Sequence, residues 1–293
     1  MAILVDAHTR VLCQGMTGWA GSHHSAQMIE YGTRIVAGVT PGKGGRVHIG
    51  VPVFDTVRAA VEQTKANASI VFVPPDYAAG AILEAIDAEL PLVVAVTERI
   101  PVLEMVRVRD ALKGSRTKLV GPNSQGVLAP GLCKIGVMAT GSERPGSIGI
   151  MSRSASLTSE IVAQITSVGL GQSTTVGVGG DPIHGIGFIE CMEMFFADKD
   201  TTGIVLIGEI GGAEEERAAE FLAGIKPQIP IIALIVGRHA PPERRMGHAG
   251  ALTKYKGADA ASKIAALQAV GVIIAQSAHR VGETVREALA PPA

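Results

Sequence analysis

The chain alternates short apolar runs rich in β-branched residues with stretches of helical periodicity, almost from one end to the other. The runs are continuous rather than alternately apolar and polar, which is typical of strands buried on both faces of a sheet. This pattern predicts parallel, doubly wound sheets and therefore an α/β fold. We expect strands over 11–15, 34–39, 68–73, 92–96 and 118–120, and again over 147–151, 173–178, 203–209, 230–237 and 272–275.

The alternation pauses once, between residues 122 and 146. Pro122, Pro130 and Pro145 stand here among many glycines, and no helical pattern is visible. Glycine and proline at this density are typical of loops. Because an average domain has roughly 150 residues, a chain of 293 residues predicts two open α/β domains, 1–121 and 147–293, joined by a linker over 122–146.

Composition argues against several classes of protein. Hydrophobic residues make up 47% of the chain, enough for full cores, and a net charge of −1 is unfavourable for wrapping a nucleic acid. One Trp, three Tyr and six Phe are too few for a surface that stacks single-stranded nucleic acid. No apolar stretch reaches the roughly 20 residues of a membrane span, and the N-terminus lacks a signal-peptide pattern. The three cysteines have no metal-ligand spacing, so we expect no metal site and a reducing cytoplasm.

A glycine-rich turn, Gly15–Gly21, joins the first predicted strand to its helix. Such a turn can bring backbone amides at a helix N-terminus against a pyrophosphate, although the G-x-x-G-x-x-G spacing also fits a plain strand–helix turn. A nicotinamide-binding fold places an acidic residue at the end of the second strand, whereas this chain has Lys43 there. Unless Lys43 is merely solvated, it favours a ligand with a phosphate on its ribose, such as coenzyme A or NADP. The surrounding glycines do not have the spacing of an NTP-binding loop.

A histidine, His248, lies in a loop among small residues, with Arg244 and Arg245 just upstream. An imidazole that can be approached closely can act as a nucleophile toward phosphorus; a plain surface histidine is the competing interpretation. Glu209 follows a predicted strand, where it could hold the ring in one tautomer. Ser154 begins a predicted helix, where it could cradle a phosphate or simply cap the helix.

Taken in order, these motifs resemble a known family over nearly the whole chain. The matching segments are Gly15-Met16-Thr17-Gly18, 38–45 (G-V-T-P-G-K-G-G), Gly121-Pro122-Asn123, Ser152-Arg153-Ser154, 177–182, 207–212 and 245–251 (R-M-G-H-A-G-A). The chain resembles the α subunits of succinate–CoA ligases (NDP-forming succinyl-CoA synthetases), or of a close relative such as malate–CoA ligase. The resemblance implies a Rossmann-like, CoA-binding N-terminal domain and a flavodoxin-like, doubly wound C-terminal ligase domain.

The resemblance also implies a mechanism. His248 would take a phosphoryl group from ATP or GTP and pass it to a dicarboxylate, with Glu209 orienting the ring, and CoA would attack the resulting acyl phosphate. The residues expected to bind CoA are Thr17, Gly18, Trp19, Ala20, Lys43, Val96, Thr97, Glu98, Asn123 and Ser124. Those expected near the phosphoryl group or the acid are Ser154, Ala155, Ser156 and Ser159. A β subunit of ATP-grasp fold would hold most of the nucleotide and its Mg²⁺, in an αβ or α2β2 assembly that serves the tricarboxylic acid cycle in the cytoplasm.

Several positions depart from the family pattern, and three of them bear most on the substrate. Where the family commonly has G-P-N-C-P-G, this chain has Ser124 and Gln125, and Ser159 replaces a tyrosine associated with the acid. These changes predict an acid other than succinate alone, either a hydroxy-dicarboxylate of the malate type or a bulkier acid. Two other classes of function stay open, namely a non-catalytic CoA-binding regulatory protein and an NADP oxidoreductase.

Overall fold

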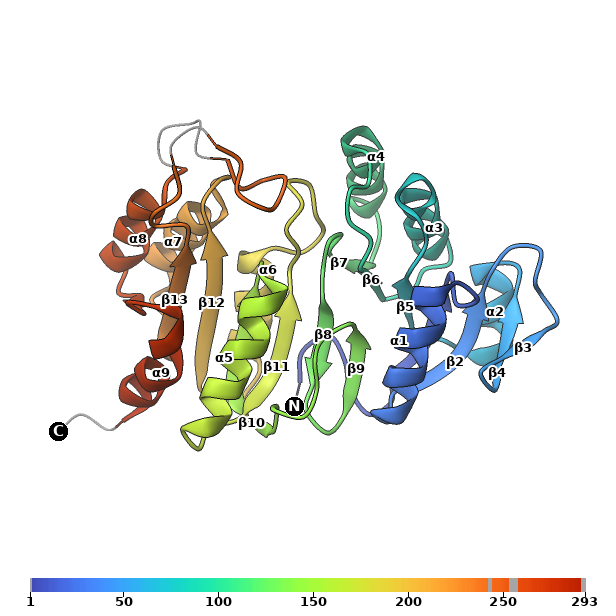
Figure 1. Cartoon of the computed structure of the whole chain (residues 1–293), viewed down its shortest axis with the longest axis horizontal. Helices are drawn as coiled ribbons and strands as arrows, with labels where there is room; N and C mark the ends of the chain where they lie inside the picture. Colours follow the sequence, from blue (N-terminus) through green and yellow to red (C-terminus); the bar gives the residue numbers. More distant parts are fainter. Residues whose placement is uncertain (1, 242–243, 253–257, 291–293) are drawn as a thin grey trace.

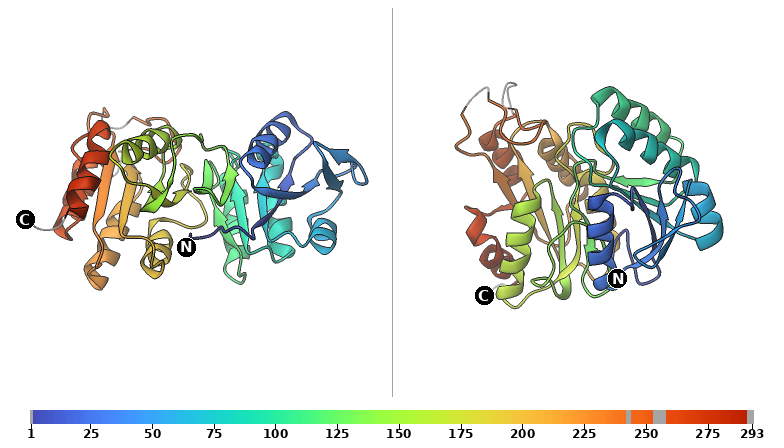
Figure 2. Two further views of the ribbon diagram at one scale, coloured as in Figure 1. Left: turned by 90° about the horizontal axis from the view of Figure 1, so that it is seen from below. Right: turned by 45° about the vertical axis from the view of Figure 1, so that its right-hand side comes forward.

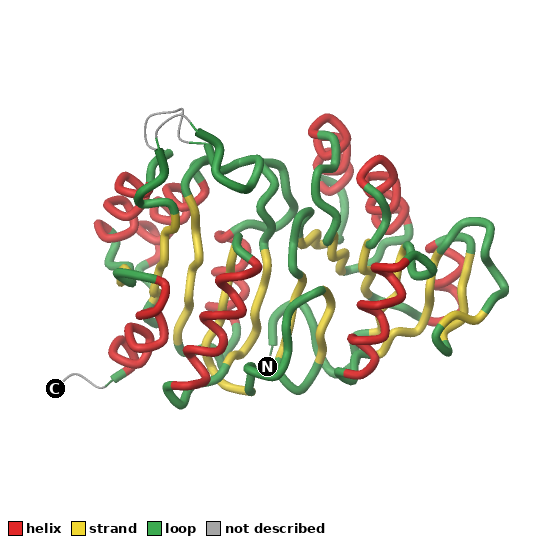
Figure 3. Tube along the Cα trace, viewed as in Figure 1, coloured by secondary structure: helices red, strands yellow, loops and turns green. Residues whose placement is uncertain are grey.

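The computed structural model describes residues 2–241, 244–252 and 258–290, and these residues form two seven-stranded sheets. The two halves lie side by side along the longest axis of the molecule (Figures 1 and 2). Helices cover the sheets and loops collect at the strand ends, as the colouring of Figure 3 shows. Within the described residues, no helix is both long and apolar enough to cross a bilayer.

The first sheet has the strand order β3-β4-β2-β1-β5-β6-β7, and every pairing is parallel except that of β3 with β4. Its parallel strands follow the order 3-2-1-4-5-6 of a Rossmann fold, as predicted, and such folds bind ligands where β1 and β5 diverge. The elements are β1 (Arg10–Gln14), α1 (Trp19–Glu30), β2 (Arg34–Val39), β3 (Val47–His48), β4 (Val51–Phe54), α2 (Val57–Thr64), β5 (Ala68–Val71), α3 (Pro75–Asp87), β6 (Leu92–Ala95), α4 (Val102–Leu112) and β7 (Lys118–Val120).

The second sheet has the order β14-β13-β12-β10-β11-β8-β9. Its five parallel strands follow the flavodoxin-like order 2-1-3-4-5, again as predicted. The elements are β8 (Gly126–Ala129), β9 (Cys133–Gly136), β10 (Pro145–Ser152), α5 (Ala155–Ser167), β11 (Gln172–Gly177), α6 (Phe188–Ala197), β12 (Gly203–Glu209), α7 (Glu214–Ile225), β13 (Ile231–Val236), α8 (Ala260–Ala269), β14 (Ile273–Ile274), the 3₁₀ turn η1 (Ala278–Arg280) and α9 (Val281–Leu289).

The structure differs from the sequence prediction over residues 122–146, which were expected to form only a linker. Strands β8 and β9 lie within this segment, pair antiparallel, and extend the second sheet beyond β11. The glycines here serve strand pairing: Gly126 has φ +110°, and a Cβ on it would lie 1.9 Å from the carbonyl oxygen of Ile135. Only glycine allows the two backbones to approach so closely, so the glycine-rich composition is explained by a hairpin.

This hairpin also connects the two halves of the molecule. The hydroxyl of Thr33, at the end of the first α/β repeat, donates to the carbonyl of Lys134 at 2.7 Å and accepts from the amide of Lys134 at 2.9 Å. One buried apolar cluster runs from Val94 and Val120 in the first sheet through Val127 to Met151 in the second. The continuous core holds the carboxyl ends of both sets of parallel strands in a fixed relation, and those ends build the site.

Candidate active site

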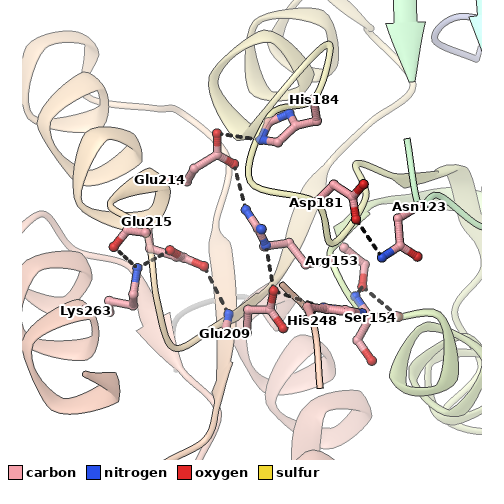
Figure 4. Close-up of polar contacts among 12 residues, drawn as sticks. Asn123, Arg153, Ser154, Asp181, His184, Glu209, Glu214, Glu215, His248 and Lys263 are labelled. Carbon is pink, nitrogen blue, oxygen red and sulfur yellow. Dashed lines mark hydrogen bonds and ion pairs between the residues drawn. The ribbon is translucent and has the colours of Figure 1, made fainter. Parts of the chain in front are cut away.

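A histidine–carboxylate pair lies at the carboxyl edge of the second sheet (Figure 4). Strand β12 ends at Glu209, whose carboxylate oxygens lie 2.8 and 3.0 Å from Nδ1 of His248. The His248 side chain is 28% exposed and that of Glu209 only 8%. The hydrogen bond to Glu209 raises the pKa of the imidazole above its ordinary value, against the opposing effect of partial burial. Glu209 therefore holds the ring through Nδ1, and Nε2 is the ring nitrogen that this contact leaves for a reaction.

The loop that carries His248 folds back on itself and packs against a glycine. Arg245 and Leu252 form an antiparallel bridge, and the amide of Ala251 donates to the carbonyl of His248 at 3.1 Å. The imidazole lies directly over Gly180, where a Cβ would come within 2.5 Å of the ring atom Cγ. The ring therefore occupies space that any other residue at position 180 would fill.

Arg153 connects Glu209 to a second histidine–carboxylate pair (Figure 4). It follows β10, and its Nε donates to Glu209 Oε1 at 3.0 Å while its Nη1 donates to Glu214 Oε2 at 3.3 Å. The other oxygen of Glu214 lies 2.9 Å from Nε2 of His184. Sequence reasoning noted Arg153 only as a neighbour of Ser154 and did not identify His184 or Glu214. The signal for Arg153 was its position directly after a parallel strand, where α/β proteins place functional side chains.

A buried ion pair supports Glu209 from behind. The backbone amide of Glu209 donates to Glu215 Oε1 at 3.0 Å, and the other oxygen of Glu215 forms a hydrogen-bonded ion pair with Nζ of Lys263. Lys263 is fully buried on α8 and also donates to the carbonyl of Gly212 at 3.2 Å. A charge buried this deeply is tolerated only when it is paired, so α7 and α8 together hold the end of β12 in place.

A cavity of about 520 Å³ opens in front of the imidazole. It brings together residues from both domains: Glu98, Arg99, Ile100, Pro101, Val102, Met105, Asn123, Asp181, Pro182, Ile183, Arg245, Gly247, His248 and Ala249. Burial raises the pKa of the Asp181 carboxyl, which accepts a 3.1 Å hydrogen bond from the side-chain amide of Asn123. Two residues predicted to bind CoA, Glu98 and Asn123, thus share a cavity with His248.

The glycine turn of the first domain has the geometry of an anion site. Gly15 adopts φ +81°, and a Cβ on it would lie 2.8 Å from the carbonyl oxygen of Phe72. Gly18 then precedes α1 without a side-chain cap, so the amides of the first turn of the helix, including those of Trp19 and Ala20, are not covered by a capping side chain. Backbone amides and the helix dipole make such a turn favourable for phosphate.

A lysine stands beside this turn, as the sequence predicted. Nζ of Lys43 donates to the hydroxyl of Thr17 at 2.9 Å, and that hydroxyl lies 3.3 Å from the hydroxyl of Thr40. Lys43 comes from the loop after β2, so the ends of β1 and β2 place an ammonium group next to the first turn of α1. The structure therefore brings together the predicted phosphate-binding residues of the first domain.

Other predicted residues have structural partners. Val96 and Thr97 follow β6, where the hydroxyl of Thr97 donates to the carbonyl of Val73 at 2.7 Å. Ser124 is buried; its hydroxyl donates to the carbonyl of Gly177 and accepts from the amide of Gly126, so it supports the fold around the cavity.

The residues at the start of α5 are not among those that line this cavity. Ser154 caps the helix by accepting from the amide of Leu157 at 3.4 Å, and Ala155 and Ser156 are exposed beside it. Ser159 lines a separate cavity of about 30 Å³ together with Gln125 and Thr158. The structure does not bring Ser159 into the cavity that contains His248.

Comparisons with known proteins agree with this architecture. The CoA binding domain matches residues 6–99 and the CoA-ligase domain matches residues 151–273. The chain is 50% identical to the succinate–CoA ligase [ADP-forming] α subunit of Aquifex aeolicus, over 99% of this chain and 95% of that one. It is 47% identical to the corresponding subunit of Staphylococcus aureus, over 98% and 95%. The chain belongs to the succinate–CoA ligase α-subunit family. The family predicted from the motifs is confirmed.

A solved structure supports the fold at greater evolutionary distance. The ATP citrate lyase of Methanothrix soehngenii, solved with citrate and coenzyme A, superposes with a TM-score of 0.88 at 22% sequence identity. The match covers 98% of this chain and 50% of the lyase, so this chain spans half the length of that protein.

Proposed function

We propose that this chain is the α subunit of an NDP-forming acid–CoA ligase, in which a phosphoryl group passes from the nucleotide through His248 to a dicarboxylate, by family default succinate. The observation that carries the proposal is the His248–Glu209 pair, with hydrogen-bond distances of 2.8 and 3.0 Å at the edge of a cavity shared by both domains.

The geometry fits a nucleophilic imidazole. With its Nδ1–H donated to Glu209, the ring carries its lone pair on Nε2. Nε2 attacks the γ-phosphorus, the N–P bond forms, and the bond to the departing NDP breaks. A carboxylate oxygen of the acid then attacks phosphorus and releases the imidazole. The thiolate of CoA attacks the acyl carbon and expels inorganic phosphate, so His248 returns to its starting state.

The charges around Glu209 suit this cycle. Arg153 lies 3.0 Å from the same oxygen that contacts His248, and it stabilises the carboxylate as an anion. The anion in turn stabilises the imidazolium, or the positive charge that develops on the ring when Nε2 bonds to phosphorus. Glu209 therefore acts as the orienting carboxylate.

The first domain fits coenzyme A. The amides around Thr17, Gly18, Trp19 and Ala20 suit the diphosphate, and Lys43 suits the phosphate on the ribose. The pantetheine arm would run past Val96, Thr97 and Glu98 toward Asn123 and Ser124, ending near the cavity in front of His248. This path would deliver the thiol to the acyl phosphate.

We assign the nucleotide, ATP or GTP with Mg²⁺, mainly to a β subunit of ATP-grasp fold, in an αβ or α2β2 assembly that works in the cytoplasm. The N-terminus of α5, which Ser154 caps and Ala155 and Ser156 begin, would serve as a second anion site and receive the phosphoryl group.

The acid itself is a separate question. Ser159 and Gln125 replace the family's tyrosine and proline, and they line a small cavity in which the side-chain amide of Gln125 donates to the hydroxyl of Thr158 at 2.7 Å. We propose that malate or another dicarboxylate is accepted beside succinate or in its place. Competition assays with succinate, malate and longer diacids check this, and a strong preference for succinate over all the others would contradict it.

Transfer of labelled phosphate tests the main proposal. The chain, co-expressed with its β subunit, is incubated with γ-labelled ATP or GTP beside His248→Ala and the exposed control His279→Ala. We expect acid-labile, base-stable label on the wild type and the control, and none on His248→Ala. Loss of the label on addition of acid and CoA would then identify the substrate. Failure of both nucleotides to label a chain that still binds CoA would refute the enzymatic role.

A further inference from the structure

Four rings form a column beside the glycine turn, and its outermost member is exposed. Phe72, directly after β5, stacks on His24 at 5.4 Å between ring centroids; His24 contacts His23 edge-on at 5.0 Å, and His23 stacks on Trp19 at 5.3 Å with an interplanar angle of 9°. Trp19 is nonetheless 80% exposed. An indole is rarely left so open when it has only a packing role.

The column holds the indole in a fixed orientation. Its inner end, Phe72, follows a strand of the sheet, and burial lowers the pKa of His24, which favours a neutral ring in the stack. Trp19 and His23 lie one helical turn apart on α1, and helical side chains lean toward the helix N-terminus. With His23 covering one face of the indole, the other face is directed toward the N-terminal end of α1, where the glycine turn lies.

The groups around this open face match one part of coenzyme A. The amides of Trp19 and Ala20, which no side chain caps, suit its diphosphate, and Lys43, which donates to Thr17 at 2.9 Å, suits the phosphate on its ribose. The adenine base is joined to that same ribose, so a ligand anchored at both points has its base within the surroundings of Trp19. Flat aromatic faces bind bases by stacking regardless of base identity.

We propose that Trp19 stacks on the adenine ring of coenzyme A, with His23 behind it as the second layer. The inference rests on the CoA binding of the proposed function and adds the part of CoA that this chain recognises. The base, and not only the diphosphate and the pantetheine arm, then contributes to affinity.

The sequence offers a direct measurement, because Trp19 is the single tryptophan of the chain. The intrinsic fluorescence of the full-length chain therefore reports on this position alone. We expect quenching by CoA and by adenosine 3′,5′-bisphosphate, which has the base, and no quenching by 4′-phosphopantetheine, which lacks it. Equal quenching by 4′-phosphopantetheine would overturn stacking on adenine, and stronger quenching by NADP than by CoA would assign the site to a different nucleotide.

Variants separate stacking from the rest of the CoA site. By calorimetry, Trp19→Ala should weaken CoA binding about tenfold and leave 4′-phosphopantetheine binding unchanged, with Trp19→Phe in between. Ile225→Ala, another exposed apolar residue but on α7, is the matched control and should behave as wild type. CoA binding without any change in fluorescence would overturn the stacking alone, whereas absence of CoA binding by calorimetry would overturn it together with the CoA site of the proposed function.

Discussion

Substitution of Gly180 by alanine should displace the imidazole of His248 without disturbing the rest of the fold. The added Cβ would lie 2.5 Å from Cγ and 2.6 Å from both Cδ2 and Nδ1 of the ring, while ordinary contacts begin at 3.4 Å. The ring must therefore retreat by about 1 Å, since the carbon atoms cannot interpenetrate.

That displacement of the ring is large relative to the hydrogen-bond distances that it changes. The hydrogen bonds of Nδ1 to Glu209 measure 2.8 and 3.0 Å, and a contact near 3.6 Å no longer counts as a hydrogen bond. A misplacement of about 1 Å in a reacting group typically costs on the order of a hundredfold in rate. We expect Gly180→Ala to transfer phosphate from labelled nucleotide about a hundred times more slowly than the wild type.

Gly250→Ala is the matched control, because Gly250 lies two residues from His248 in the histidine loop and its Cβ would meet nothing closer than 3.5 Å. It should phosphorylate at nearly the wild-type rate, and both variants should bind CoA normally. A Gly180→Ala variant that is labelled as fast as Gly250→Ala would refute the idea that the ring position seen in the structure is the reactive one.

Three further predictions concern charge. Because the pKa of His248 is raised in the folded chain, its contribution to stability is full below the ordinary imidazole pKa of about 6.5 and is lost as the pH rises through the raised value. Urea unfolding from pH 6 upward should show this loss, and Glu209→Gln should flatten it. Lys263→Met should cost about 3–5 kcal/mol in the free energy of unfolding, because it leaves the Glu215 carboxylate buried without its partner. Adding Glu215→Gln should recover much of that loss, and equal stability of the single and double variants would contradict the pairing. Burial raises the pKa values of the three cysteine thiols, which should resist a thiol reagent until the chain unfolds: Cys13, Cys133 and Cys191.

The parallel strands could be predicted from sequence because their apolar runs are continuous, and the strand orders agree with the family implied by the motifs. The hairpin of β8 and β9 could not. Its strands have four residues each, and each contains a glycine, Gly126 at the start of β8 and Gly136 at the end of β9. Periodicity cannot distinguish a glycine that allows two backbones to approach from one that ends a strand, and that distinction depends on the neighbour across the sheet.

The pairing of His248 with Glu209 was accessible from sequence, because a carboxylate at the carboxyl end of a parallel strand has only one edge of the sheet on which to lie. Lys263 was not accessible, since a lysine on a helix is normally solvated. It is buried because α7 presents Glu215 and Glu216 to α8. Nζ of Lys263 pairs with Glu215 and also donates to Glu216 at 3.0 Å. Pairings between two helices leave no trace in the periodicity of either one.

Among the described residues, most of the buried charged side chains lie around this one imidazole. They are Arg153, Asp181, His184, Glu209, Glu215 and Lys263. Each unpaired member would be costly, so the members are retained only together, and their substitution effects should not add. The same dependence gives His248 its fixed position, because Glu209 is held by the Arg153 side chain and, through its backbone amide, by Glu215. The rigidity of the imidazole therefore comes from the strand end beneath it, and changes in α8 should be felt at Nε2 although no residue of that helix lines the cavity.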